Sequence, residues 1–193
     1  MRDASNGKEL IAEIEKETEI SIEVINGKKE AEIIASTDLS ELIDGKKSYL
    51  YVDVGGGSTE FTVFSKGKLL CSKSFKIGPV RLLNKNSKNK IIWKEIKNWI
   101  SVHTKGLKKM ALIGSGGNIN KIFKMSGQRP DKPLSYIYMN AHYQFLKKMT
   151  YEERISELGL NQDRADVIIP AAKIYISAMK WSKSKKIYVP KIG

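Results

Sequence analysis

A run of three glycines, Gly55 to Gly57, interrupts the strongest strand pattern in the chain. On either side lie the alternating, β-branched segments SYLYVDV (48–54) and STEFTVF (58–64), and a third segment, KLLCSKSFKI (68–77), follows a turn at 65–67. Segments of this length joined by short glycine turns are typical of antiparallel hairpins. The chain is therefore expected to contain a three-stranded meander.

Helical and strand patterns alternate after the meander. In chain order they predict a helix over 91–104, a strand over 108–114, a helix opening after Gly117, a loop over 126–136, helices over 140–149 and 151–157, a helix over 164–180 and a strand over 186–190. The resulting order is β-β-β-α-β-α, a helical insert around 126–160, then α-β. It predicts an α/β fold built on a mixed sheet with helices on both faces.

The first 45 residues are patterned differently from the rest. A helix is predicted over 8–18 with Asn6 as its N-cap, followed by a strand over 20–25 and a short helix from Lys28. We therefore divide the chain into a linking segment, residues 1–45, and an α/β lobe, residues 46–193.

Charge is distributed unevenly along the 193 residues. The chain carries a formal net charge of +13, with −7 in residues 1–60 and +20 in residues 61–193. Such asymmetry suggests a polyanionic partner, although lysine used freely at solvated positions produces the same count. The run WSKSKK (181–186) has the same two interpretations, a solvated helix end or a track for a polyanion. Arg81 either pairs with an acidic neighbour or lines an anion path.

Several classes of protein are excluded by composition. The single cysteine, Cys71, rules out an internal disulfide framework and a multi-cysteine zinc site. No apolar run approaches the ~20 residues that span a bilayer, and the opening MRDASNGKEL lacks the apolar core of a secretory signal. We expect a cytoplasmic protein with no membrane partner. Trp93, Trp99 and Trp181 lie on helical patterns and are expected in the core or at a contact with another lobe.

The first glycine turn has the composition of a phosphate site. Glycines allow successive backbone N–H groups to point at an anion, and Ser58 and Thr59 add hydroxyl donors. Asp53 and Glu60 place two carboxylates beside the turn. Carboxylates next to a phosphate require a divalent cation between them or a water to activate. The alternative is that the glycines only permit a tight turn.

A second glycine turn joins the predicted strand 108–114 directly to a helix. It comprises Gly114, Ser115, Gly116 and Gly117. The N-terminus of a helix offers unpaired N–H groups and the positive end of the helix dipole, which suit an anion. Neither turn has the spacing of a P-loop or of a dinucleotide-binding fingerprint. Two glycine turns that could each bind an anion, at strand ends of one mixed sheet, form a pattern distinct from both of these motifs.

These motifs resemble those of the exopolyphosphatase and guanosine pentaphosphate phosphohydrolase family, which belongs to the actin-like ATPase superfamily. The resemblance rests on VDVGGGSTE followed by the meander and IGSGGN. It is supported by Arg2, Ala4 and Asn6 in R-x-A-x-N and by three further segments: IEVINGKKEAE (22–32), GPVRLL (78–83) and RADVIIP (164–170). The resemblance implies a ribonuclease H-like lobe.

The resemblance also implies roles for single residues. Glu30 corresponds to the proposed catalytic base, and Asp53 and Glu60 correspond to acidic residues required with a metal, expected to be Mg²⁺. Gly55, Gly56, Gly57, Ser58 and Thr59 would bind phosphate, and Gly116 and Gly117 would form the adjacent wall. The implied reaction is in-line attack of water on a terminal phosphoryl group.

The implied substrate is inorganic polyphosphate, with guanosine pentaphosphate as the alternative. A polymer of anions suits the charge of +20 better than a single nucleotide does. Family members begin with a first lobe that carries another phosphate loop, so residues 46–193 are expected to form the second lobe and residues 1–45 a remnant linking to the first. We expect this chain alone to be inactive and prone to form a homodimer. A non-catalytic module that binds polyanions or nucleic acid is the alternative from another class, although no nucleic-acid-binding motif is visible.

Overall fold

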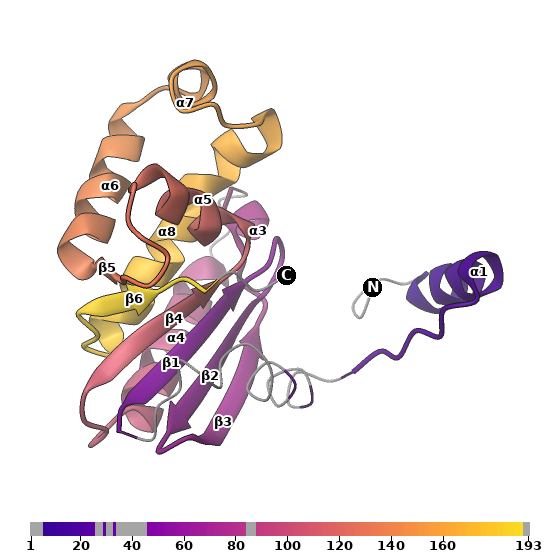
Figure 1. The fold of residues 1–193 in the computed structure, drawn as a ribbon, viewed down its shortest axis with the longest axis horizontal. Coiled ribbons are helices and arrows are strands. Elements are labelled where there is room, and N and C mark those ends of the chain that lie inside the picture. Colours follow the sequence, from indigo (N-terminus) through magenta and orange to yellow (C-terminus); the bar gives the residue numbers. More distant parts are fainter. Residues whose placement is uncertain (1–5, 26–28, 30–32, 34–45, 84–87, 191–193) are drawn as a thin grey trace.

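A computed structural model describes residues 6–25, 29, 33, 46–83 and 88–190. Its centre is one six-stranded mixed sheet in the order β3-β2-β1-β4-β6-β5 (Figure 1). The strands are β1 (Ser48–Val54), β2 (Thr59–Ser65), β3 (Lys68–Phe75), β4 (Met110–Ser115), β5 (Leu134–Ser135) and β6 (Lys186–Tyr188). The predicted α/β fold with a mixed sheet is confirmed.

The register of the sheet places both glycine turns at one edge. The first three strands form the predicted antiparallel meander, with Asp53 opposite Glu60 across β1 and β2. Strand β4 runs parallel to β1, with Asp53 opposite Ser115, and β6 runs parallel to β4. The carboxyl ends of β1 and β4 therefore meet, which is where ligands bind in sheets of this kind.

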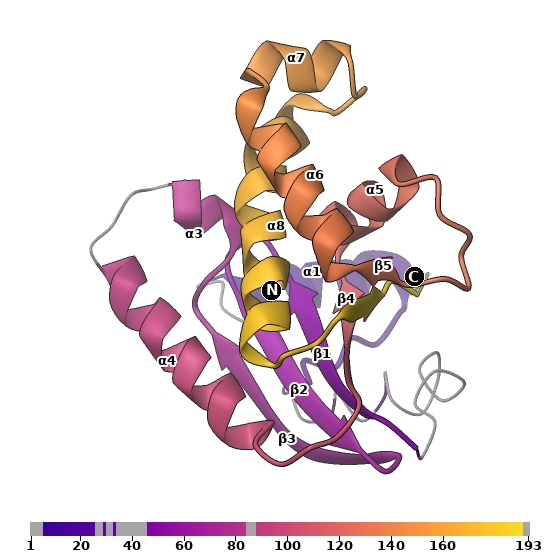
Figure 2. The ribbon, with the colours of Figure 1, turned by 90° about the vertical axis from the view of Figure 1, so that its left-hand side faces the viewer.

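Helices connect the strands that follow β3, and one further helix precedes β1 in the chain. They are α1 (Gly7–Thr18), α3 (Pro79–Leu83), α4 (Lys88–His103), α5 (Gly117–Met125), α6 (Tyr136–Lys148), α7 (Tyr151–Ser156) and α8 (Gln162–Trp181). Figure 2 shows α4 and α8 on the same side of the sheet. Among the described residues, no helix is long and apolar enough to cross a membrane.

The main core fills the space between one sheet face and α4, α5 and α8. Leu50, Val52 and Val54 point into it from β1 and are at most 4% exposed. Two aromatic contacts extend it, since Trp99 packs on Phe61 and Phe75, and Trp93 meets Trp181 edge-on with ring centroids 5.6 Å apart. All three tryptophans are half-buried and pack against the main core.

The opposite sheet face carries its own buried cluster. It consists of Tyr49, Tyr51, Phe64, Ala111 and Ile113, which alternate with the main-core residues as a strand requires. The described helices that contact the sheet contribute their buried side chains to the main core. In the described part of the chain, helices contribute buried side chains to one sheet face only, so the expected helices on both faces are not seen there.

The structure differs from the sequence predictions in four local details. Residues 20–25 carry no regular secondary structure despite their strand pattern, because a strand forms only with a neighbour in register. Asn6 precedes α1 but its side chain makes no capping hydrogen bond. Leu134–Ser135 lie within a predicted loop and instead pair antiparallel with β6. The short helix α3 was not predicted. The helix expected from Lys28 falls outside the described residues.

Candidate active site

The two glycine turns line one pocket at the carboxyl ends of β1 and β4. The pocket has a volume of about 490 Å³ and lies between the turns, the start of α3 and the first turn of α8. The residues that line it are Asp53, Val54, Gly55, Gly56, Pro79, Val80, Gly116, Gly117, Asn118, Asp163, Arg164 and Val167. The fold thus brings together the two glycine turns, which were predicted separately as anion sites from distant segments of the sequence.

Hydrogen bonds to its carbonyl groups hold the first glycine turn in shape. The carbonyl oxygen of Ser58 accepts from Gly55 N–H at 3.0 Å, and that of Gly56 accepts from Val80 N–H at 3.1 Å. Arg81 Nε donates to the carbonyl oxygen of Gly57 at 2.7 Å. Carbonyl groups held in this way present less negative charge to an incoming phosphate.

There is no room for a side chain between this turn and Gly78, which packs against it. A Cβ at Gly78 would lie 2.3 Å from the carbonyl oxygen of Gly56, so only glycine fits there. Thr59 is fully buried, and its hydroxyl donates to the carbonyl oxygen of Ile77 at 2.6 Å. The Thr59 hydroxyl therefore ties β2 to the segment before α3, whereas Gly55, Gly56 and Gly57 are exposed and Ser58 is half-buried.

Two side chains of α8 hold the second glycine turn in place. Arg164 Nη1 donates to the carbonyl oxygen of Gly117 at 2.6 Å, and the Tyr175 hydroxyl donates to the carbonyl oxygen of Ser115. Gly116 has φ +115° and ψ 155°, a conformation essentially restricted to glycine. This conformation turns the chain from β4 into α5 directly beside Val54.

Asn118 adds an amide group to the pocket. It lies in the first turn of α5, and its Oδ1 is buried with no hydrogen-bond partner among the described residues. A buried polar atom without a partner costs about 1–3 kcal/mol, so a ligand that donates to Oδ1 would bind favourably here.

The two predicted acidic residues face the same side of the sheet. Asp53 and Glu60 are register partners, and directly opposed side chains on an antiparallel pair are neighbours. Burial raises the pKa of Asp53, and the negative charge of Glu60 raises it further, while a hydrogen bond with the Ser115 side chain acts in the opposite direction. A bound cation would relieve both unfavourable effects.

This donor set fits Mg²⁺ better than a metal held wholly by protein. No group of three or more His, Cys, Asp or Glu residues gathers within the described part of the chain. Mg²⁺ characteristically uses one or two carboxylates and completes its coordination with water and substrate phosphates. Asp53 and Glu60 have the required chemistry. Glu30, the predicted base, lies outside the described residues.

Sequence reasoning did not assign to the site Arg164 and Asn118, which line the pocket, or Arg81, which holds the first glycine turn from outside the lining. Arg81 was left with two interpretations, and Arg164 and Asn118 had no assigned role. The contacts of the two arginines cross 24 and 47 residues of chain. Their only sequence signal is their place in GPVRLL and RADVIIP, segments that carried the resemblance.

The fold and the paired glycine turns define one lobe of an actin-like ATPase fold. The family model described as Ppx/GppA phosphatase matches residues 1–193. The chain belongs to the Ppx/GppA phosphatase family.

Known proteins agree with this assignment. The structure is similar to that of an exopolyphosphatase from Cytophaga hutchinsonii, with a TM-score of 0.79 and 26% identity over 98% of this chain and 67% of that one. In sequence the chain is 34% identical over 129 residues to the bifunctional 3-dehydroquinate synthase/phosphatase of Fusobacterium nucleatum, covering 60% of this chain and 19% of that protein. It is 25% identical over 190 residues to a Haemophilus influenzae protein named "Putative exopolyphosphatase", covering 90% and 58%. The chain thus spans less than two thirds of these two relatives.

Proposed function

We propose that this chain acts in the hydrolysis of terminal phosphoanhydride bonds of inorganic polyphosphate. The observation that carries the proposal is the convergence of two glycine turns, Arg164 and the carboxylate of Asp53 on one pocket of about 490 Å³. Backbone N–H groups and a guanidinium group suit the oxygens of a phosphoryl group, and a carboxylate suits a cation or a water beside it.

Each group has a distinct part in this proposal. The turn Gly55–Gly57 binds the terminal phosphoryl group, and Arg81 and Arg164 each hold one of the two glycine turns in shape through a backbone carbonyl. Asp53 and Glu60 would hold Mg²⁺, which when bound neutralises charge on the phosphoryl oxygens. Glu30 orients or deprotonates the attacking water.

Charge supports polyphosphate as the substrate in preference to a nucleotide. Residues 61–193 carry a net charge of +20, which exceeds what a single guanosine pentaphosphate can use. The name of the Cytophaga hutchinsonii structure supports the same substrate class. Guanosine pentaphosphate is the competing substrate, and a direct comparison separates the two.

The test is phosphate release by the full 193-residue chain with Mg²⁺, from long-chain polyphosphate and from guanosine pentaphosphate. Release from polyphosphate that Asp53→Asn and Glu30→Gln both abolish would support the proposal. Glu152→Gln is the matched control, because Glu152 lies on α7, is exposed and does not line the pocket. Faster release from guanosine pentaphosphate would identify that nucleotide as the substrate, and no release from either would refute activity of this chain.

A further inference from the structure

A second and larger pocket lies at the other end of the parallel strands. Its volume is about 740 Å³, and it is lined by the connection from α4 to β4, the connection from α8 to β6 and the residues before β1. Because β1, β4 and β6 are parallel, these three connections meet at the amino ends of the strands. The candidate active site lies at the carboxyl ends.

Lysine dominates the lining of this pocket, and none of the described residues that line it is acidic. The lysines come from three separate parts of the chain: Lys47, Lys105, Lys109, Lys183, Lys185 and Lys186. Like charges gathered in one concave surface repel one another, and at physiological salt the repulsion extends over about 8 Å. We name this surface the lysine pocket.

The backbone of the lysine pocket is unusual at two lysines. Lys109 and Lys183 have φ of 54° and 57°, in the left-handed region where glycine or asparagine is favoured. A lysine held in this conformation costs of order 1 kcal/mol or more. Each lies in a connection that lines the pocket, and Lys66, outside the pocket, has the same conformation with φ 52°.

Helix ends account for only part of this charge. Helices α4 and α8 both end beside the pocket, and cations are favourable near the negative end of a helix dipole. Lys105 and Lys183 are explained in this way. Lys185 and Lys186 instead precede or begin strand β6, beyond the last turn of α8. The helix dipoles therefore do not account for the charge at the start of β6.

The polar groups at the base of the pocket are already used. Thr104 Oγ1 donates to the carbonyl oxygen of Ile100 at 2.7 Å, and Ser182 Oγ donates to that of Ala178 at 2.7 Å. Trp181 is fixed by its edge-on contact with Trp93. The pocket is thus a firm concavity, and a ligand would be recognised mainly by the lysine side chains around it.

We propose that the lysine pocket binds a segment of inorganic polyphosphate at a distance from the candidate active site. The proposal rests on the proposed function in that the same polymer would reach both sites. A concave pocket of this volume suits a thin, flexible chain of phosphates, whereas duplex nucleic acid needs an extended groove-binding element. From Lys47 to Asp53, β1 spans about 20 Å at ~3.3 Å per residue, so the two sites are separate.

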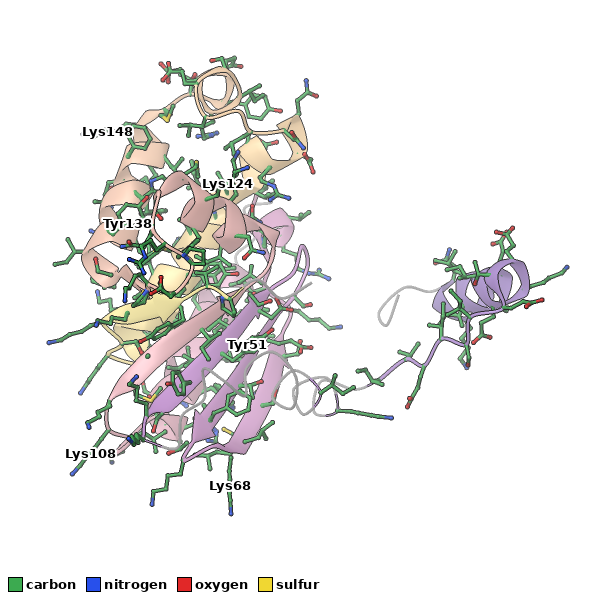
Figure 3. All side chains as sticks on the ribbon, in the orientation of Figure 1. Tyr51, Lys68, Lys108, Lys124, Tyr138 and Lys148 are labelled. Carbon is green, nitrogen blue, oxygen red and sulfur yellow. The ribbon has the colours of Figure 1, made fainter. Side chains whose placement is uncertain are left out.

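The experiment measures binding of long-chain polyphosphate to the full chain carrying Asp53→Asn, without Mg²⁺, over a range of salt concentrations. The pocket variant carries Lys105→Gln, Lys109→Gln, Lys185→Gln and Lys186→Gln. The matched control removes four exposed lysines elsewhere, through Lys90→Gln, Lys124→Gln, Lys147→Gln and Lys148→Gln. Figure 3 labels Lys124 and Lys148 far from Lys108, which immediately precedes Lys109 of the pocket.

We expect the pocket variant to bind at least about tenfold more weakly than its parent at low salt. The slope of log K against log salt should fall by about 3, at ~0.7 per lost lysine contact, while the control changes less. Equal affinity of the pocket variant and its parent, or an equal loss in the control, would overturn the proposal. Equally tight binding of single-stranded DNA through the same four lysines would overturn it in favour of nucleic acid.

Two further measurements keep the result decisive. Thermal unfolding of each variant checks that it folds, and the pairs Lys105/Lys109 and Lys185/Lys186 are replaced separately if the fourfold variant does not. Phosphate release is measured independently with Asp53 intact. If hydrolysis fails but binding still depends on the four lysines, the proposed function is refuted and the proposed role of the lysine pocket stands. If hydrolysis occurs but binding does not depend on these lysines, only the proposed role of the pocket is refuted.

Discussion

Arg81 Nε lies 2.7 Å from the carbonyl oxygen of Gly57 and donates a hydrogen bond to it. The two residues belong to different connections, since Gly57 lies between β1 and β2 and Arg81 lies in α3. Through this bond, α3, which packs on α8, holds the exposed glycine turn in place. Of the two interpretations that the sequence left for Arg81, the bond argues against the ion pair, because the partner is a backbone carbonyl and not an acidic side chain; Arg81 does not line the pocket either.

Arg81→Ala should loosen the first glycine turn without unfolding the lobe. A hydrogen bond to a charged donor contributes about 1.5–3 kcal/mol, so amide hydrogen exchange over residues 55–58 should accelerate about tenfold or more. Arg129→Ala is the control, because the Arg129–Asp131 ion pair is exposed on a loop far from this turn in sequence. Unchanged exchange over 55–58 in Arg81→Ala would show that other contacts hold the turn.

Gly116→Ala should lower the free energy of unfolding by about 3 kcal/mol. The added Cβ would lie 2.8 Å from the carbonyl oxygen of Val54, and φ of +115° is unfavourable for alanine. Gly127→Ala is the matched control, because Gly127 has φ +63° with no atom within 4 Å of the added Cβ. It should cost only about 1 kcal/mol. Denaturant unfolding measures both, and equal losses would contradict this account of Gly116.

Asp53→Asn should stabilise the protein at pH 7 while removing a group that the proposed reaction needs. Burial and the charge of Glu60 raise the pKa of Asp53, so its ionised form is disfavoured in the folded state. A neutral amide removes this penalty, and substitutions of this kind commonly add about 1 kcal/mol. Thermal unfolding without added cation tests the prediction. A lower unfolding midpoint for Asp53→Asn would mean that the carboxylate is structurally favourable.

His142 should make stability fall in mild acid. It stacks on Tyr138, its Nε2 is buried without a hydrogen-bond partner among the described residues, and burial lowers its pKa. The unfolded chain therefore binds the proton more readily, and stability declines as pH falls below about 6.5, down to the lowered folded pKa. The unfolding midpoint should drop more between pH 7 and pH 5 in the wild type than in His142→Phe. Parallel pH profiles would exclude His142 as the cause.

Sequence reasoning predicted the fold where the signal was local. The glycine turns, the meander and α5 each follow from residues adjacent in the chain. The helix predicted over 91–104 begins earlier, at Lys88, since helix starts are weakly encoded. The two-residue strand β5 and the five-residue helix α3 are too short for a periodic pattern to appear.

Contacts between distant segments were beyond sequence reasoning. Residues 20–25 have the composition of a strand, but strand formation depends on a neighbour that composition does not specify. Arg164 has an ordinary place in an amphipathic helix, and only the fold brings its guanidinium group to Gly117. The lysine pocket is likewise assembled from three connections, of which the sequence singled out only 181–186.

Strand β1 has a mechanical consequence for a polymeric substrate. It lies between two hydrogen-bonded neighbours in the sheet, so its length is fixed, and it carries the glycine turn at one end and Lys47 at the other. A phosphate chain shorter than this spacing cannot occupy both ends at once. If the two proposed sites bind one polyphosphate chain, tight retention would begin only above a minimum number of phosphates, and the length of β1 would set that number.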